Sequence, residues 1–225
     1  MPNLPEVEAR RIQGDEAMAY EEGGFRREAQ KRYYALAEKV ATPLVRVGVT
    51  PDVLTVAGVL LSLAAGVLFG LGEIFWGGIV FWFSGIMDPL DGTVARLTGK
   101  ASRSGALFDS TMDRYAEFFV FFGFLVYFRR GFMFYIVMLA LMGSLMVSYV
   151  KARGESLGQK EVRGLMQRPE RLILLMIGTI FNTPLNHFLF ADCDNCTVKG
   201  TLVILAVLTN LTAIQRLIAG RRELS

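Results

Sequence analysis

The sequence predicts an all-α integral membrane protein with six transmembrane helices, preceded by an amphipathic helix at the cytoplasmic membrane interface. Of its 225 residues, 52% are hydrophobic, and the mean hydropathy of +0.39 is too high for an ordinary soluble domain of this length. Six apolar stretches also approach the roughly 20 residues that cross about 30 Å of hydrocarbon. We expect transmembrane helices at residues 53–71, 74–94, 106–128, 132–150, 172–190 and 201–218.

The residues before the first span divide into two parts. Residues 1–24 are polar and acid-rich and end in Gly-Gly, which is typical of a flexible tail or a linker. Residues 25–47 place Phe25, Leu36 and Val40 at helical spacing among lysines and arginines, and this pattern predicts an amphipathic helix lying on the membrane interface. A solvated helix without membrane contact is the alternative.

Lysine and arginine are distributed asymmetrically between the two membrane faces. Of 24 such residues, 20 lie before the first span, between spans two and three, between spans four and five, or at the end of the chain. Because cytoplasmic loops are enriched in these residues, we expect both termini in the cytoplasm and the protein in the cell membrane. A basic cytoplasmic face suits anionic lipids and phosphorylated ligands, and we expect no nucleic-acid partner. The six-helix domain is expected at 48–220, with a basic tail at 221–225.

Four aspartates lie where the predicted second and third spans face each other. Asp88 and Asp91 are three residues apart, and Asp109 and Asp113 are four apart, so each pair shares one face of a helix. A polar turn between antiparallel spans would bring all four near one membrane surface. Carboxylates there need compensating charge, because an ion in low dielectric costs several kcal/mol. Ligation by oxygen alone favours Mg²⁺, Mn²⁺ or Ca²⁺.

Two other interpretations of these aspartates stay open. They could form salt bridges with Arg96, Arg103 or Arg114 and only stabilise the helix bundle. Gly92 and Gly105 beside the pairs instead favour a ligand site, since glycine lets helix backbones approach closely or lets a ligand pass near the main chain. A cation transporter is the second alternative, but it would place acids near the bilayer midplane, with access from both sides.

The stretch from Asp88 to Asp113 resembles the signature of the CDP-alcohol phosphotransferases, D-x-x-D-G-x-x-A-R followed by G-x-x-x-D-x-x-x-D, with all eight positions matched. The resemblance implies a six-helix membrane enzyme, usually a homodimer, that transfers a phosphatidyl group from a CDP-linked lipid to an alcohol and releases CMP. It also implies two Mg²⁺ ions, or Mn²⁺, on the four aspartates, with Asp113 as general base. The implied CDP-lipid contacts are Asp91, Gly92, Ala95, Arg96, Ser102 and Gly105.

Two further segments bear on the acceptor alcohol. "VSYVKARGESLG" and "GLMQRPERLILL" resemble stretches of prokaryotic phosphatidylinositol-phosphate synthases and their archaeal ether-lipid counterparts. This resemblance implies that inositol 1-phosphate accepts the lipid from CDP-diacylglycerol or an archaeal CDP-ether lipid. Glycerol 3-phosphate is the alternative acceptor, because Gly154 and "MQRPER" depart from the subfamily pattern, and positive-inside loops alone would also explain the basic residues. The implied phosphate-binding cluster comprises Lys151, Arg153, Arg168, Arg171 and Arg216.

The external connection before the last predicted span holds the remaining residues with chemical potential. Cys193 and Cys196 form a C-x-x-C pair, which is compatible with a disulfide or a metal clip but lacks the second ligand pair of a structural zinc site. His187 is the single histidine, and we expect it at the surface, far from the aspartates.

Overall fold

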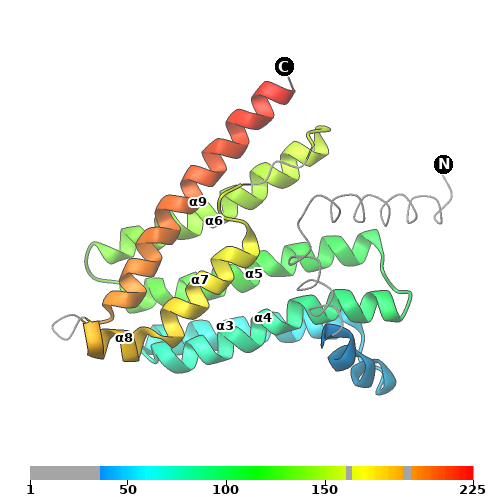
Figure 1. The fold of residues 1–225 in the computed structure, drawn as a ribbon, viewed down its shortest axis with the longest axis horizontal. Coiled ribbons are helices and arrows are strands. Elements are labelled where there is room, and N and C mark those ends of the chain that lie inside the picture. Colours follow the sequence, from blue (N-terminus) through cyan, green and yellow to red (C-terminus); the bar gives the residue numbers. More distant parts are fainter. Residues whose placement is uncertain (1–35, 161–163, 190–193, 225) are drawn as a thin grey trace.

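The computed structural model describes residues 36–160, 164–189 and 194–224, and these residues contain helices but no strand (Figure 1). Residues 36–46 are helical, and seven further helices follow. These are α3 (Pro51–Leu71), α4 (Ile74–Leu97), α5 (Arg103–Tyr127), α6 (Met133–Ser156), α7 (Arg168–Ile180), α8 (Asn182–Leu189) and α9 (Cys196–Glu223). The predicted all-α class is therefore confirmed for the described part of the chain.

Three described helices are long and apolar enough to cross a membrane. They span Pro51–Leu71, Phe132–Ser156 and Cys196–Glu223, in agreement with the predicted first, fourth and sixth spans. Helices α4 and α5 coincide with the predicted second and third spans and have 24 and 25 residues. Their facing ends carry charged side chains, which lowers their hydropathy. The protein is a membrane protein, and the charged residues of α4 and α5 lie in the C-terminal part of α4 and the N-terminal part of α5.

The predicted fifth span, 172–190, is not one continuous helix. Helix α7 has 13 residues and α8 has eight, so α7 is only about 20 Å long. Pro184 lies in the first turn of α8, where its missing N–H costs little. Asn182 is 2% exposed; its side-chain oxygen accepts the Val198 N–H at 3.2 Å, and its amide donates to Asn195 at 2.5 Å. These polar contacts hold the break against the start of α9.

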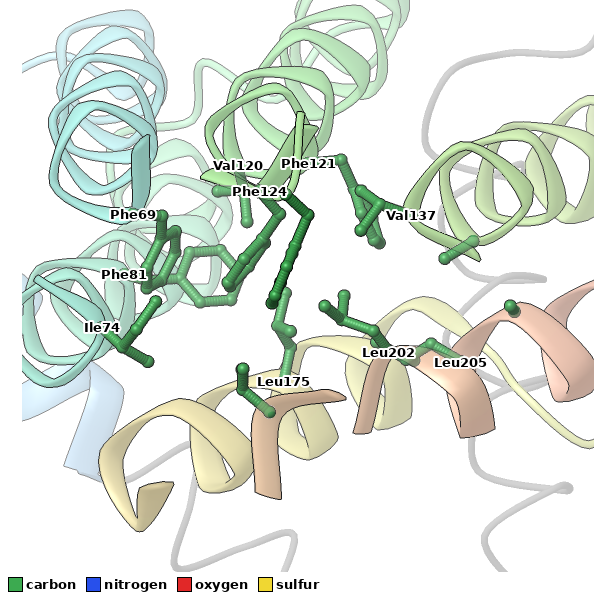
Figure 2. Close-up of a cluster of buried hydrophobic side chains, with 14 of the residues drawn as sticks. Phe69, Ile74, Phe81, Val120, Phe121, Phe124, Val137, Leu175, Leu202 and Leu205 are labelled. Carbon is green, nitrogen blue, oxygen red and sulfur yellow. The ribbon is translucent and has the colours of Figure 1, made fainter. Parts of the chain in front are cut away.

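Glycines bring α3 and α5 into close contact. A Cβ on Gly66 would lie 2.3 Å from the Phe119 carbonyl oxygen, and one on Gly123 would lie 2.1 Å from the Gly66 carbonyl oxygen. Only glycine permits this approach of two backbones, as is common between helices in membranes. Beside this contact, Phe69 stacks on Phe124 with ring centroids 4.3 Å apart, at the centre of the apolar cluster in Figure 2. The rigid contact fixes how α5 is positioned relative to α3.

The helix at residues 36–46 is fixed to the same end of the bundle as the aspartates. Ala41 is fully buried and packs with Leu54, Leu90 and Val94 of α3 and α4. Leu36 is 63% exposed, so the helix also presents apolar surface outward. The predicted residue Phe25 and the whole of residues 1–24 lie outside the described residues.

Candidate active site

Three of the four aspartates converge between α4 and α5. One carboxylate oxygen each from Asp88, Asp109 and Asp113 lies within 4.8 Å of the other two. Asp88 is near the end of α4, and the other two are on the first turns of α5, so the antiparallel packing brings their side chains together. Such a set of oxygen ligands is suited to a hard divalent cation.

Asp91 is held slightly apart from that cluster. It is 6% exposed, and its Oδ2 accepts a hydrogen bond of 2.8 Å from the hydroxyl of Thr55 on α3. Asp91 therefore has a fixed orientation set by a residue that sequence reasoning did not identify. No sequence periodicity indicates Thr55, because the contact depends on how α3 packs against α4.

An arginine from α7 lies among the aspartates. Arg168 donates from Nη1 to Asp88 Oδ1 at 2.8 Å and from Nη2 to Asp113 Oδ1. The aspartates therefore form an ion pair with an arginine, as in the alternative interpretation in which they only stabilise the bundle. The arginine, however, is one that was predicted to bind the acceptor. Of the arginines considered for that ion pair, Arg96 donates to Thr93 Oγ1 at 2.9 Å.

The aspartate cluster has a carboxylate oxygen that the ion pair with Arg168 does not satisfy. Asp109 Oδ1 is buried and has no hydrogen-bond partner in the described part of the chain. Buried carboxylate oxygens are rarely left unsatisfied in native proteins, and the positive charges of Arg168 and the nearby Arg114 do not balance the four aspartates. The side chains of this site therefore fit a divalent cation.

The residues predicted to contact the CDP-lipid lie at the end of α4 and at the start of α5. A Cβ on Gly92 would meet only Arg96 Nη1, at 3.5 Å, so Gly92 is not required for close helix packing and leaves open space beside α4. Ser102 caps α5: its Oγ accepts the Gly105 N–H at 3.0 Å. Ala95 lies on the last turns of α4, half-buried. A small side chain at Gly92 would therefore meet only the end of the Arg96 side chain.

Two arginines of the predicted acceptor cluster are buried together. Arg171 and Arg216 are 3% and 4% exposed. Arg171 Nη2 donates to Ser148 Oγ at 3.4 Å, and Arg216 Nη1 donates to the Val147 carbonyl at 3.1 Å. Because Val147 and Ser148 are consecutive, the two guanidinium groups contact the same turn of α6. Helices α7 and α9 thus deliver one arginine each to one place.

The other two predicted members of that cluster lie further along α6. Lys151 is half-buried and forms an ion pair of 3.7 Å with Glu155. Arg153 is exposed, and its Nη1 donates to Ser156 at 3.5 Å. Two residues on a helix differ in direction by about 200°, so Lys151 and Arg153 cannot face the same ligand. The geometry favours Lys151, on the less exposed face, and does not bring Arg153 to the arginines.

Glu117 was missed by sequence reasoning. It is 5% exposed, and its Oε1 lies 3.2 Å from Arg171 Nε. Glu117 continues the four-residue spacing of Asp109 and Asp113 by one more turn, so these carboxylates share one face of α5. That spacing was the available signal.

The external residues lie away from the aspartates. Cys196 at the start of α9 is disulfide-bonded, while Cys193 lies outside the described residues. His187 is on α8 and stacks edge-on against Phe188, with ring centroids 5.3 Å apart. Helix α8 and the start of α9 lie at the opposite end of the bundle from the facing ends of α4 and α5 (Figure 1).

Comparison with known proteins identifies the chain. A family model described as CDP-alcohol phosphatidyltransferase matches residues 48–213, which include the aspartate cluster. The chain belongs to the CDP-alcohol phosphatidyltransferase family. It is thus a transferase, and the signature that predicted this family is confirmed by the match over most of the chain.

Two members of the family show how similar the chain is to individual proteins. The chain is 37% identical over 183 residues to the phosphatidylinositol phosphate synthase of Mycobacterium tuberculosis (strain H37Rv), covering 79% of this chain and 82% of that protein. It is 33% identical over 189 residues to the archaetidylinositol phosphate synthase of Pyrococcus horikoshii, covering 83% and 92%.

Solved structures of the M. tuberculosis enzyme share the fold. Its crystal structure with CDP-DAG bound has a TM-score of 0.73 and 34% identity, covering 83% of this chain and 94% of that one. The structure in complex with manganese and citrate has the same TM-score and identity, covering 82% and 88%.

Proposed function

We propose that this protein transfers the phosphatidyl group of CDP-diacylglycerol, or the corresponding group of an archaeal CDP-ether lipid, to inositol 1-phosphate and releases CMP. One observation carries the proposal: the carboxylate cluster of Asp88, Asp109 and Asp113 lies in one bundle with two buried arginines, Arg171 and Arg216, that meet at one turn of α6. The names of the bacterial and archaeal relatives support the same reaction.

The aspartates would hold the metal ions. We propose two Mg²⁺ ions, with Mn²⁺ as a substitute, on Asp88, Asp91, Asp109 and Asp113; manganese in the structure of the relative supports a divalent metal. Two such ions would neutralise the diphosphate and stabilise the entering and leaving oxygens of an in-line displacement. Arg168 contacts Asp88 and Asp113, two of the proposed metal ligands. For Arg168 to bind the acceptor phosphate, its guanidinium group would have to move away from these carboxylates.

Asp113 would act as the general base. It would take the proton of the acceptor hydroxyl as that oxygen attacks the phosphorus attached to the lipid. Asp113 is 14% exposed, and its restricted contact with water favours proton transfer to the carboxylate rather than to solvent. The side chain of Asp91, fixed by Thr55, would orient the other side of the metal site.

The nucleotide would occupy the open space beside α4. Gly92 and Ala95 leave room there for the cytidine, and Arg96, four residues after Gly92 and on the same helix face, would contact the diphosphate. Gly105 and Ser102 would border the site at the start of α5, where Ser102 also caps the helix. The CDP-DAG in the structure of the relative supports a CDP-linked lipid as donor.

The acceptor phosphate would bind to the basic cluster. Charge-assisted contacts to phosphate are stronger than neutral ones. Arg171 and Arg216 contact one turn of α6, and Lys151 lies about one turn further along that helix. Arg153 stays a weaker candidate, because it is exposed and faces another direction.

The same proposal places the protein in the cell membrane. Both termini and the charged end of the bundle would face the cytoplasm, where basic residues accumulate. The helix that includes residues 36–46 would lie on the interface, with Leu36 and Val40 exposed toward lipid, and two chains would form a homodimer.

An acceptor panel tests this function. The purified protein in detergent receives CDP-diacylglycerol, Mg²⁺ and one acceptor: inositol 1-phosphate, glycerol 3-phosphate, free inositol or serine. CMP release above the acceptor-free control is expected with inositol 1-phosphate. Release with glycerol 3-phosphate alone would keep the enzyme class but replace the acceptor, and release with free inositol would contradict a phosphate-binding cluster.

A further inference from the structure

Glu117 and Arg171 form an ion pair in apolar surroundings. Their side chains are 5% and 3% exposed, and Arg171 Nε lies 3.2 Å from Glu117 Oε1. A small cavity beside the pair is otherwise lined by apolar side chains: Phe81, Val120, Phe121, Leu172, Leu175 and Leu205. Burying two charges there costs several kcal/mol per ion, which their attraction only partly repays. Stability alone therefore gives no reason to keep this pair in place of apolar side chains.

The pair leaves hydrogen-bonding capacity unused. Arg171 Nε, Arg171 Nη1 and Glu117 Oε2 are buried and have no hydrogen-bond partner in the described residues, so the two side chains form an ion pair without a hydrogen bond. Nη2 makes one long contact of 3.4 Å with Ser148 Oγ. A buried guanidinium with an unpaired donor is expensive, unless a ligand completes its contacts. Phosphate, like carboxylate, matches the geometry of a guanidinium group.

Glu117 and Ser148 contact different edges of the Arg171 guanidinium group. Glu117 approaches from α5 and lies next to Nε, whereas Nη2 reaches α6 at Ser148. Arg216 meets α6 at the adjacent Val147. The carboxylate thus balances the charge of Arg171 from one side and leaves the Nη groups for a ligand near Arg216.

We propose that Glu117 is a positioning residue for the acceptor alcohol: it holds the buried Arg171 guanidinium so that its Nη groups meet the acceptor phosphate. This inference rests on the proposed function, because it deepens the role of the same basic cluster. Glu117 itself touches no substrate. It links the α5 face that carries Asp109 and Asp113 to Arg171 on α7, and so would set the distance between the metal site and the phosphate site.

Steady-state kinetics of Glu117→Gln test the proposal. Glutamine keeps the shape of the side chain and removes its charge. We expect the KM for inositol 1-phosphate to rise about tenfold or more, the typical effect of losing a contact to a charged group, while the KM for CDP-diacylglycerol changes less than about twofold. Thr179→Val is the matched control: Thr179 is fully buried on the same helix as Arg171 and hydrogen-bonds only within α7. It should change neither KM.

A double-variant cycle separates positioning from general structural support. If Glu117 acts through Arg171, adding Glu117→Gln to Arg171→Ala should raise the acceptor KM no further. Equal rises in both KM values, or effects of the two substitutions that multiply, would overturn the proposal. Should Glu117→Gln fail to fold, Glu117→Asp retains the charge with a shorter reach, and it should show a smaller rise confined to the acceptor KM; a rise in both KM values would again be contradictory.

Failure of this inference is distinguishable from failure of the proposed function. Suppose that the wild type turns over inositol 1-phosphate and that Glu117→Gln raises the KM values of both substrates equally. This result would refute only the positioning role of Glu117. Absence of wild-type turnover with that acceptor would refute the proposed function. In that case the KM values of the wild type and of Glu117→Gln are compared with the phosphorylated acceptor that does release CMP. A wild-type protein that releases CMP only with unphosphorylated acceptors would refute both the proposed function and the positioning role of Glu117.

Discussion

Asp113→Asn separates proton transfer from substrate binding. Asparagine keeps the size of the side chain but cannot accept the acceptor proton, and general bases typically contribute about 10²- to 10⁴-fold in rate, or about 3–5 kcal/mol in activation free energy. The fold should tolerate the change: Arg168 loses its contact with residue 113 but retains Asp88 at 2.8 Å. We expect a stability loss of only about 1–2 kcal/mol.

The assay measures CMP release at saturating CDP-lipid and acceptor, together with binding of the CDP-lipid to the same preparation. We expect turnover to fall by at least about 10²-fold, while lipid binding stays close to that of the wild type. Asp194→Asn, an exposed aspartate at the opposite end of the bundle, is the matched control and should keep full activity.

A metal titration tests whether Asp113→Asn loses activity through weaker metal binding instead of through loss of the base. If Asp113→Asn lost activity only because metal binding weakened, a large excess of Mg²⁺ or Mn²⁺ would restore turnover. We expect no such recovery. Wild-type activity in the variant, or full recovery at high metal concentration, would refute the assignment of Asp113 as base.

Three more predictions follow from the same structure. Arg171→Ala should raise the acceptor KM at least about tenfold and leave that of the CDP-lipid nearly unchanged; equal effects would indicate a structural role. Chelation by EDTA should abolish CMP release, and Mg²⁺ or Mn²⁺ should restore it, whereas activity that survives chelation would contradict a metal-dependent site. Gly66→Ala should lower the thermal unfolding temperature in detergent, because its Cβ would lie 2.3 Å from a backbone oxygen, an overpacking cost of about 1–3 kcal/mol. Gly200→Ala, with nothing within 4 Å, should not lower it, and equal unfolding temperatures for the two variants would refute the close-contact explanation.

The helices at the predicted first, second, third, fourth and sixth spans were accessible from sequence because each is a long apolar run. The fifth was not: residues 172–190 are apolar on average, but Asn182 makes specific hydrogen bonds to the start of α9 and begins a new helix, α8. Hydropathy averages over such residues and cannot register a contact with a distant helix.

The chemistry of the site was predictable as far as it depends on spacing within one helix. The spacing within each aspartate pair and the polar turn between the two spans predicted that the four aspartates meet, and the family signature matched the same residues. Other contacts between helices were not predictable, so Thr55 beside Asp91 and Arg168 between two aspartates were not foreseen. Glu117 followed the correct spacing, but its meaning became clear only once α7 placed Arg171 against it.

The most direct test of the central claim is product analysis of one reaction. The purified protein in detergent is incubated with CDP-diacylglycerol, inositol 1-phosphate and Mg²⁺, and lipids are identified by mass spectrometry while CMP is quantified. We expect phosphatidylinositol phosphate and CMP in equal amounts, and neither should form when the acceptor or the metal is omitted. CMP release that does not depend on the acceptor, or a lipid product that lacks the inositol phosphate group, would contradict it.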